Sequence, residues 1–195
     1  TYIENGTEEM AGQLHTLSYI AETGKEKFAG KLCNQTIKYC DCVVADETAF
    51  ETMLCPAYTQ IIGTYPKQEN EIMLSTKTLT YLGISEPKVG MELKLDFYWN
   101  DLFQTKGTGQ QTFQLSGYFT EYQNQGASSS IAFLSEKKLK ESGAGWDPCR
   151  ILVKPEKDSV SGIQMEQQLQ KDIRLEEGQR IVSMDSAAYR AVEGM

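Results

Sequence analysis

The feature that most constrains the fold is the stretch MELKLDFYW at residues 91–99. Apolar side chains occupy every second position, and mostly charged residues fill the positions between them. A period of two is that of a β-strand, in which alternate side chains point to opposite faces. Strands with one buried and one solvated face are typical of antiparallel sheets. The sequence therefore predicts a half-buried antiparallel strand whose inner face carries Met91, Leu93, Leu95, Phe97 and Trp99.

The remaining segments predict a mixture of short strands and short helices. β-branched and aromatic runs indicate strands over 14–21, 36–45, 58–66, 71–75, 112–122, 131–135, 149–155 and 179–184. Helical periodicity and caps indicate helices over 24–32, 46–54, 77–83, 136–143 and 161–173. Residues 1–12 are expected to form a weak helix or a tether, residues 100–111 a loop, and residues 184–195 a helix.

Several positions have specific local roles in this prediction. Asp46, Ser135 and either Ser75 or Thr76 are expected to cap helices, and Gly83 to end one. Gly117 interrupts the inward face of 112–122, as at a β-bulge. The inward residues of that strand are expected to be Phe113, Leu115 and Phe119, and one helical stripe is expected to carry Met165, Leu169 and Ile173.

The order of these elements predicts an α+β fold with an insertion. β-α-β units occur near both ends of the chain, and a β-rich block lies between them. We expect residues 1–66 and 146–195 to form one α/β subdomain, and residues 67–145 an inserted β-rich subdomain with its own core.

Composition excludes some partners. The 195 residues carry a formal net charge of −8, and their lysines and arginines are scattered. Nucleic acid and anionic membrane surfaces require clustered basic residues, so neither is expected as the main partner. No apolar run approaches the roughly 18 residues that would span a bilayer. Since the chain begins at Thr1 and ends within a predicted helix, we expect a domain excised from a longer protein.

The five cysteines do not form a recognisable framework. Cys40 and Cys42 point the same way in a strand, with Cα atoms about 7 Å apart, at the limit of disulfide reach. Free thiols are the favoured interpretation, with one structural disulfide as the alternative. No metal is expected, because the chain lacks CxxC pairs and has one histidine.

The sequence offers no recognisable catalytic site and no cofactor site. His15, the single histidine, alternates with apolar residues on a predicted strand and is expected to pack there. No nucleophile elbow is present, and the GTG at 107–109 lacks the continuation of a phosphate-binding loop.

Aromatic residues around the 100–111 segment suggest a contact surface. Two interpretations remain open: amphipathic tyrosines on a sheet, or an exposed patch that binds a peptide or protein. The residues of this candidate surface are Tyr98, Phe103, Tyr118 and Tyr122.

One set of short motifs, spread over residues 60–135, resembles the extracytoplasmic domain of MacB/FtsX-type ABC transporter permeases, of the kind found in Gram-positive Firmicutes. The order and spacing of the set carry the resemblance. Its members are Gly63 and Pro66, Asn70-Glu71-Ile72, Leu82-Gly83, Val89-Gly90, and Phe113, Leu115 and Gly117.

The resemblance implies a fold and a role. In this family the domain lies outside the cytoplasmic membrane between two transmembrane helices, with an α/β "porter" part and an inserted β-rich "sabre" part. It implies partners: the permease's own transmembrane helices, a separate cytoplasmic ATPase, and a peptide, lipoprotein or cell-wall component. It also implies transmission of ATP-driven motion and no enzymatic activity.

The alternatives are a free-standing secreted or surface binding module and, less favoured, a hydrolase. The geometry of the chain ends separates the first two. A domain held between two membrane helices should have adjacent ends that leave in the same direction.

Overall fold

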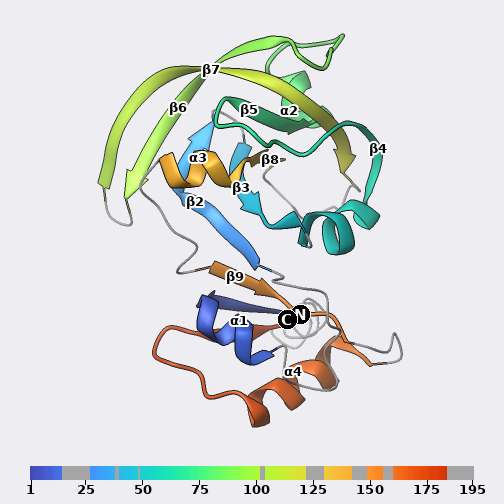
Figure 1. Ribbon diagram of the computed structural model, residues 1–195, viewed down its shortest axis with the longest axis vertical. Coiled ribbons are helices and arrows are strands. Elements are labelled where there is room, and N and C mark those ends of the chain that lie inside the picture. Colours follow the sequence, from blue (N-terminus) through green and yellow to red (C-terminus); the bar gives the residue numbers. More distant parts are fainter. Residues whose placement is uncertain are drawn as a thin grey trace, which may run out of the picture. The chain divides into compact units, whose positions relative to one another are not determined.

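The computed structural model describes residues 1–14, 27–37, 40–47, 49–101, 104–121, 130–141, 149–155 and 160–183. The chain divides into two compact units (Figure 1). Unit 1 comprises Thr1–Ala29 and Trp146–Met195, and unit 2 comprises Gly30–Gly145. No helix in the described ranges is long and apolar enough to cross a membrane.

Unit 1 is a small antiparallel sheet packed against two helices. Strand β1 lies between β10 and β9, and the first residues of β2 pair with the other edge of β9. The elements of this unit are β1 (Tyr2–Gly6), α1 (Glu8–Leu14), β9 (Cys149–Leu152), α4 (Gly162–Asp172) and β10 (Arg180–Val182), with β2 (Lys27–Ile37) beginning here.

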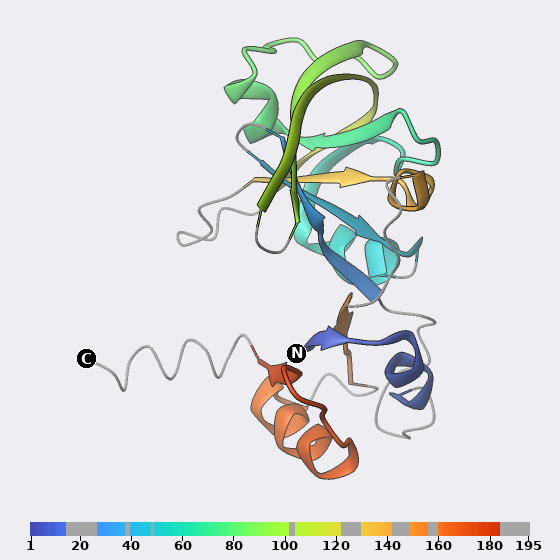
Figure 2. The ribbon, with the colours of Figure 1, turned by 90° about the vertical axis from the view of Figure 1, so that its left-hand side faces the viewer.

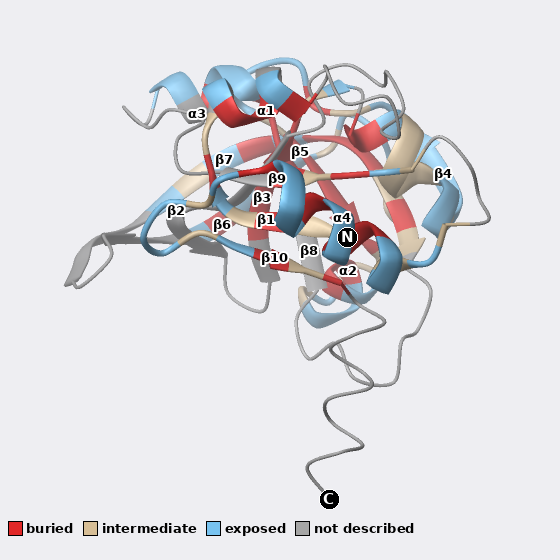
Figure 3. Cartoon of the chain, turned by 90° about the horizontal axis from the view of Figure 1, so that it is seen from below, coloured by how far each residue is buried: buried red, intermediate tan, exposed pale blue. Residues whose placement is uncertain are grey.

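A row of isoleucines forms the sheet side of the unit 1 core. Ile3 pairs directly with Ile181 on one side and with Ile151 on the other. Directly opposed residues on adjacent strands point to the same face. Both helices turn their buried residues toward this core (Figure 3). The helical residues in the cluster are Met10, Ala11, Leu14, Met165 and Leu169, followed by Ile173 just after α4.

The start of α4 is fixed locally. The Ser161 side chain accepts a hydrogen bond from the backbone N–H of Gln164, whose side chain accepts one from the N–H of Ser161. This reciprocal capping box satisfies two backbone donors that a helix start otherwise leaves unpaired. The predicted stripe of Met165, Leu169 and Ile173 is confirmed, because all three are buried.

Unit 2 is a mixed sheet with short helices. Its strands lie in the order β3-β8-β5-β7-β4, and β6 pairs with both β2 and β7. The elements of this unit are β3 (Cys40–Ala45), the π-helix η1 (Ala49–Leu54), the 3-10 helix η2 (Cys55–Ala57), β4 (Tyr58–Gly63), β5 (Glu71–Ser75), α2 (Thr76–Tyr81), β6 (Glu92–Asp101), β7 (Gln104–Glu121), β8 (Ser130–Leu134) and α3 (Glu136–Glu141).

The middle strands of unit 2 are covered on both faces. Residues 72–75 of β5 and 132–134 of β8 are all buried. Such continuous apolar runs are typical of central strands. By contrast, Lys94 and Asp96 of β6 are exposed while Leu93 and Leu95 are buried, which confirms the predicted alternation over residues 92–96. Met91 is half-buried just before β6, and the side chains of Phe97 and Trp99 lie outside the described part of the chain. β6 and β7 run side by side as a long curved ribbon (Figure 2).

Two predictions about elements were wrong. Residues 27–32 belong to strand β2 rather than to a helix; Gly30 disfavours helix by about 1 kcal/mol, and pairing with β9 and β6 stabilises the strand. Residues 104–111 belong to β7 rather than to a loop. There the backbone pairs with β6, with Gly107 opposite Trp99 and Gly109 opposite Phe97, and this pairing outweighs the low strand propensity of glycine.

The N-terminal prediction also needs correction. Residues 2–6 form strand β1, because they fill the gap between β9 and β10, and only residues 8–14 are helical. Three further predictions lie outside the described residues: the strand beyond Leu14, the packing of His15, and the helix at 184–195.

The unit boundary differs from the subdomain boundary expected from the sequence. Residues 30–66 belong to unit 2, whereas the sequence pattern assigned them to the α/β part. Both divisions place residues 146–195 with the N-terminus and 67–145 in the other part.

The core of unit 1 can be tested at Leu169, whose side chain is fully buried. Leu169→Ala should lower the free energy of unfolding by about 2–5 kcal/mol, because it removes buried methyl groups and leaves a cavity. Chemical denaturation of the 195-residue chain measures this loss. Gln167→Ala, at an exposed position of the same helix, should change stability by less than about 0.5 kcal/mol. Equal effects of the two would contradict the packing described here.

Candidate functional site

The structure places only part of the predicted aromatic surface. Phe103 and Tyr122 lie outside the described residues. Tyr98 of β6 pairs with Thr108 of β7, whereas Tyr118 lies ten positions further along β7. Ten strand residues span about 33 Å when extended. Tyr118 is half-buried and pairs with Ile62 and Leu74. The surface therefore stays a prediction, and the backbone does not place Tyr98 next to Tyr118.

Two glycines of the sequence motifs, Gly63 and Gly117, meet where the end of β4 pairs with β7. This close approach of the two backbones is called the crossing below. Gly63 is paired with Gly117. A Cβ atom on Gly63 would lie 2.3 Å from the Ser116 carbonyl oxygen, and one on Gly117 would lie 2.6 Å from the Ile62 carbonyl oxygen. Gly63 also has a φ of +87°, which strongly favours glycine. Both positions therefore require a residue without a side chain.

The predicted bulge lies at this same crossing. Ile72 pairs with Leu115 and Met73 with Gly117, so Ser116 is the extra residue of β7. Its hydroxyl donates to the Ile72 carbonyl at 3.1 Å, and its carbonyl accepts from the N–H of Thr64 at 2.9 Å. The bulge thus has its polar groups satisfied by β5 and by the residue after β4.

The other motif residues form turns that end on β7. The Glu71 carboxylate accepts the N–H groups of Lys67 and Gln68 at 2.7 and 2.9 Å, which closes the turn before β5. The Asn70 carbonyl accepts from Gln114, and the Leu115 carbonyl accepts from Gly90 at 2.8 Å. These motifs therefore position strands around residues 114–117 of β7.

The Leu82-Gly83 motif ends helix α2. Gly83 has a φ of +75° and its N–H donates to the Thr80 carbonyl, while the N–H of Ile84 donates to the Leu79 carbonyl at 2.9 Å. This pair of bonds is the Schellman motif, which satisfies carbonyls at a helix end. The predicted cap at the other end is confirmed, since the Ser75 side chain accepts from the Thr78 N–H.

A cleft of about 650 Å³ lies beside this crossing, within unit 2. Three chain segments line it: the end of β3 with η1, the chain from Ile61 to Lys67, and the start of α3. Its lining residues include Asp46, Glu47, Phe50, Glu51, Cys55, Ile61, Tyr65 and Lys67.

Aromatic rings pack along the cleft. The ring centroid of Phe50 lies 4.5 Å from that of Tyr65 and 5.1 Å from that of Phe133. The Tyr65 hydroxyl accepts from the Ala45 N–H at 2.8 Å and reaches the carbonyl oxygens of Ala45 and Leu134 at 2.9 and 3.1 Å. Burial raises the pKa of Tyr65, so this hydroxyl stays protonated and fastens the β4–β5 connection to β3 and β8.

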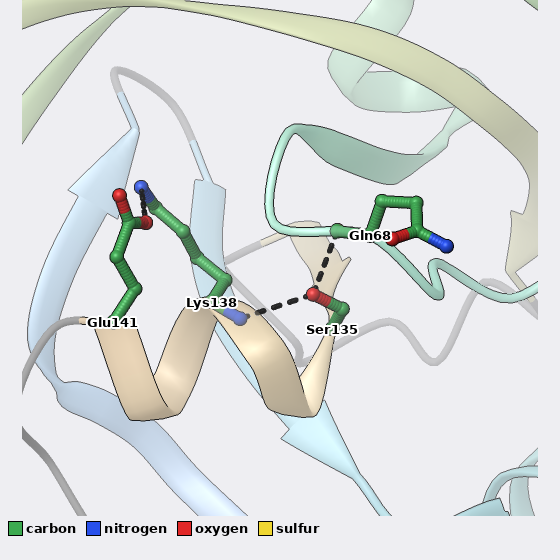
Figure 4. A network of polar contacts seen from close by, with 4 residues as sticks. All are labelled: Gln68, Ser135, Lys138 and Glu141. Carbon is green, nitrogen blue, oxygen red and sulfur yellow. Dashed lines mark hydrogen bonds and ion pairs between the residues drawn. The ribbon is translucent and has the colours of Figure 1, made fainter.

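The α3 wall is held by a polar network (Figure 4). The Ser135 hydroxyl donates to the Gln68 carbonyl at 2.7 Å and accepts from the Lys138 N–H at 3.1 Å. The predicted cap at Ser135 is therefore confirmed. The buried Lys138 ammonium pairs with Glu141 at 2.6 Å.

The rim of the cleft is predominantly acidic. Four carboxylates and two lysines line it: Asp46, Glu47, Glu51 and Glu136, with Lys67 and Lys137. The Asp46 carboxylate accepts from the Ala49 N–H at 2.8 Å, which confirms the predicted cap, and Glu136 pairs with Lys140 at 2.9 Å. Glu47 and Glu51 are exposed on the same wall.

Two cysteines have described side chains. Cys42 is buried in β3, and Cys55 is a free thiol, half-buried at the cleft. Burial, and secondarily the Glu51 carboxylate, raise the pKa of the Cys55 thiol, so it is a weak nucleophile at neutral pH. In the described part of the chain no group of three or more His, Cys, Asp or Glu side chains is arranged to hold a metal ion.

The cleft was missed by sequence reasoning. The sequence predicts only a helix cap at Asp46, and nothing in it brings Asp46 and Glu47 next to residues 61–67. Tyr65 lies between the motif residues Gly63 and Pro66, which was the one local signal available.

Comparisons with known proteins give matches of structure alone. The chain matches no family model and no curated protein. The periplasmic region of MacB from Actinobacillus actinomycetemcomitans matches over 100% of this chain and 92% of its own length, with 13% identity and a TM-score of 0.57. The extracellular domain of YknZ, a noncanonic ABC-type transporter from Gram-positive bacteria, matches over 91% and 89%, with 13% identity and a TM-score of 0.50.

These matches show the fold. The chain has the α+β fold of the MacB periplasmic region, which confirms the predicted fold class. The resemblance noted in the sequence motifs is confirmed at the level of fold.

The crossing of β4 and β7 can be tested with two glycines that share a positive φ. Gly83→Ala places a Cβ in open space and should cost about 1–2 kcal/mol from backbone strain alone. Gly63→Ala adds a contact with the Ser116 carbonyl and should cost clearly more, or prevent folding. Thermal and denaturant unfolding of both variants measures the difference. A loss at Gly63 no larger than that at Gly83 would contradict the close approach.

The Tyr65 hydroxyl is the second target. Tyr65→Phe keeps the ring and leaves the Ala45 N–H without its partner, so the free energy of unfolding should fall by about 1–3 kcal/mol. Tyr81→Phe, at an exposed position, should stay within about 0.5 kcal/mol of the wild type. Denaturation curves without a difference between these variants would show that the hydroxyl does not brace the cleft.

Proposed function

We propose that this chain is the extracytoplasmic domain of an ABC transporter permease, and that it transmits ATP-driven motion to a substrate or partner outside the membrane. The observation that carries the proposal is the fold likeness to the MacB periplasmic region, which extends over 100% of this chain and 92% of that one. An isolated shared motif would not give a match of this extent. The YknZ extracellular domain supports the same assignment.

The geometry of the first and last described strands supports this role. Tyr2, at the start of β1, pairs with Val182, at the end of β10, and the two strands are antiparallel. The start of β1 and the end of β10 therefore lie side by side, at the same end of the sheet. A domain held between two consecutive membrane helices needs this arrangement.

The two units suit a transmitting domain. Unit 1 has its own core around the isoleucine row, and unit 2 buries a separate set of residues on β5, β7 and β8. A part with its own core can move as one body. We assign unit 1 to the porter-like part and unit 2 to the sabre-like part, with residues 30–66 in the latter.

The partners in this proposal are the transmembrane helices of the same permease and a separate cytoplasmic ATPase subunit. The domain itself carries out no catalytic step in this role. Its location would be the outer side of the bacterial cytoplasmic membrane, where it would contact a peptide, a lipoprotein or a cell-wall component.

An antibody against the 195-residue chain tests the proposal in cells of the source bacterium. It should detect a protein longer than 195 residues that stays with the membrane after an alkaline wash, since membrane helices resist such extraction. Protease added to intact spheroplasts should remove the signal and spare a cytoplasmic marker. Immunoprecipitation from mild detergent should recover an ATP-hydrolysing subunit. A soluble antigen in the culture medium would instead favour the secreted binding module.

A further inference from the structure

We propose that the cleft beside β4 binds an extended segment of a partner polypeptide that carries lysine or arginine between aliphatic residues. The residues that line the cleft include none of the predicted aromatic surface, and the proposal does not depend on whether the chain is part of a permease. Shape, main chain and charge each argue for it.

The main chain along the cleft is extended and has an open edge. β4 is the last strand in the order of the sheet, so among the described strands it pairs only with β7. An edge strand presents unpaired N–H and C=O groups to which another chain can add as a strand. The chain continuing from β4 through Lys67 forms one wall of the cleft.

The backbone of β4 is irregular, which limits pairing with the strands of other chains. The register between β4 and β7 shifts between Thr59 and Ile62, and Gln60 adopts a φ of +52°. Bulges of this kind twist an edge and discourage aggregation. The part of β4 that can still pair with another chain is short and begins at Ile61. A short edge of this kind favours one specific peptide segment over a second flat sheet.

Apolar surface is available on the same strand and within the cleft. Ile61 and Ile62 are 38% and 45% exposed, and Ile61 lines the cleft with Phe50 and Tyr65. Adjacent residues of a strand point to opposite faces, so neighbouring isoleucines offer apolar contact on both sides of an added strand. Aliphatic side chains of a partner would pack here.

Charge decides the kind of partner. The exposed carboxylates of Glu47 and Glu51 line the same cleft as the β4 segment, together with that of Asp46. Opposite charge across an interface favours association and repels wrong partners. A basic segment is therefore favoured and an acidic one disfavoured, in keeping with the chain's net charge of −8.

The test uses the 195-residue chain and three fluorescein-labelled nonapeptides. The basic probe is KVTVKVTVK, the acidic probe is EVTVEVTVE, and the third is the basic probe with N-methyl groups on alternate residues, which removes strand-pairing donors. Fluorescence anisotropy should show saturable binding of the basic probe alone. Hydrogen exchange should show that it protects residues 58–67.

Paired charge reversals locate the site. Glu47→Lys combined with Glu51→Lys should weaken binding of the basic probe by at least about tenfold. Glu86→Lys combined with Glu92→Lys makes the same charge change at exposed positions outside the cleft and should stay within about twofold of the wild type. Circular dichroism and the melting temperature check that both variants fold.

Several results would overturn the proposal. They are binding of no probe, equal binding of the acidic or N-methylated probe, and unchanged binding by the Glu47 and Glu51 variant. If sedimentation shows a dimer that Ile61→Lys abolishes, the open edge of β4 binds a second copy of the chain and not a basic peptide. If the protein is found in the membrane but binds no peptide, this inference is wrong and the proposed permease role still holds.

Discussion

The close approach of β4 to β7 at Gly63 and Gly117 is the constraint on which the rest of unit 2 depends. The backbones approach so closely that a methyl group on either glycine would overlap a carbonyl oxygen. The Ser116 bulge next to it lets β7 bond to β5 and to the residue after β4 at one point. A single long strand can thereby hold β4, β5 and β6 in one mixed sheet.

The cleft is a consequence of that crossing. After Gly63 the chain turns away from β7, and the Tyr65 hydroxyl fastens it to β3 and β8. The Glu71 carboxylate and the Ser135 hydroxyl then hold the turn around Gln68. Binding surface and scaffold therefore share residues. The motifs that resemble those of permease domains specify how strands join, and the proposed recognition depends on the side chains around them.

Predictions succeeded where a few neighbouring residues decide the structure. The alternation around Leu93 and Leu95, the caps at Ser75 and Ser135 and the bulge near Gly117 were all evident in short windows. They failed where distant pairing outweighs local preference. Residues 27–32 form a strand because Lys27 and Phe28 pair with β9 at the start of β2. Residues 104–111 form a strand because seven residues of β6, within 95–101, pair with them. The candidate cleft could not be predicted, because its walls come from three segments that the sequence does not connect.

The sequence by itself determined the α+β class, the strand whose alternation is borne out over residues 92–96, several helix ends, and the motifs that resemble a permease domain. These depend on side-chain alternation, caps and glycine conformations, which are local properties of the chain. The tertiary structure alone decided that Gly63 meets Gly117, that Tyr2 lies beside Val182, and that Glu47 and Glu51 line one cleft with the end of β4. Such contacts join residues far apart in sequence. The free energy that stabilises these contacts comes from burying the surface of one segment against that of another. No single segment of the chain therefore specifies them.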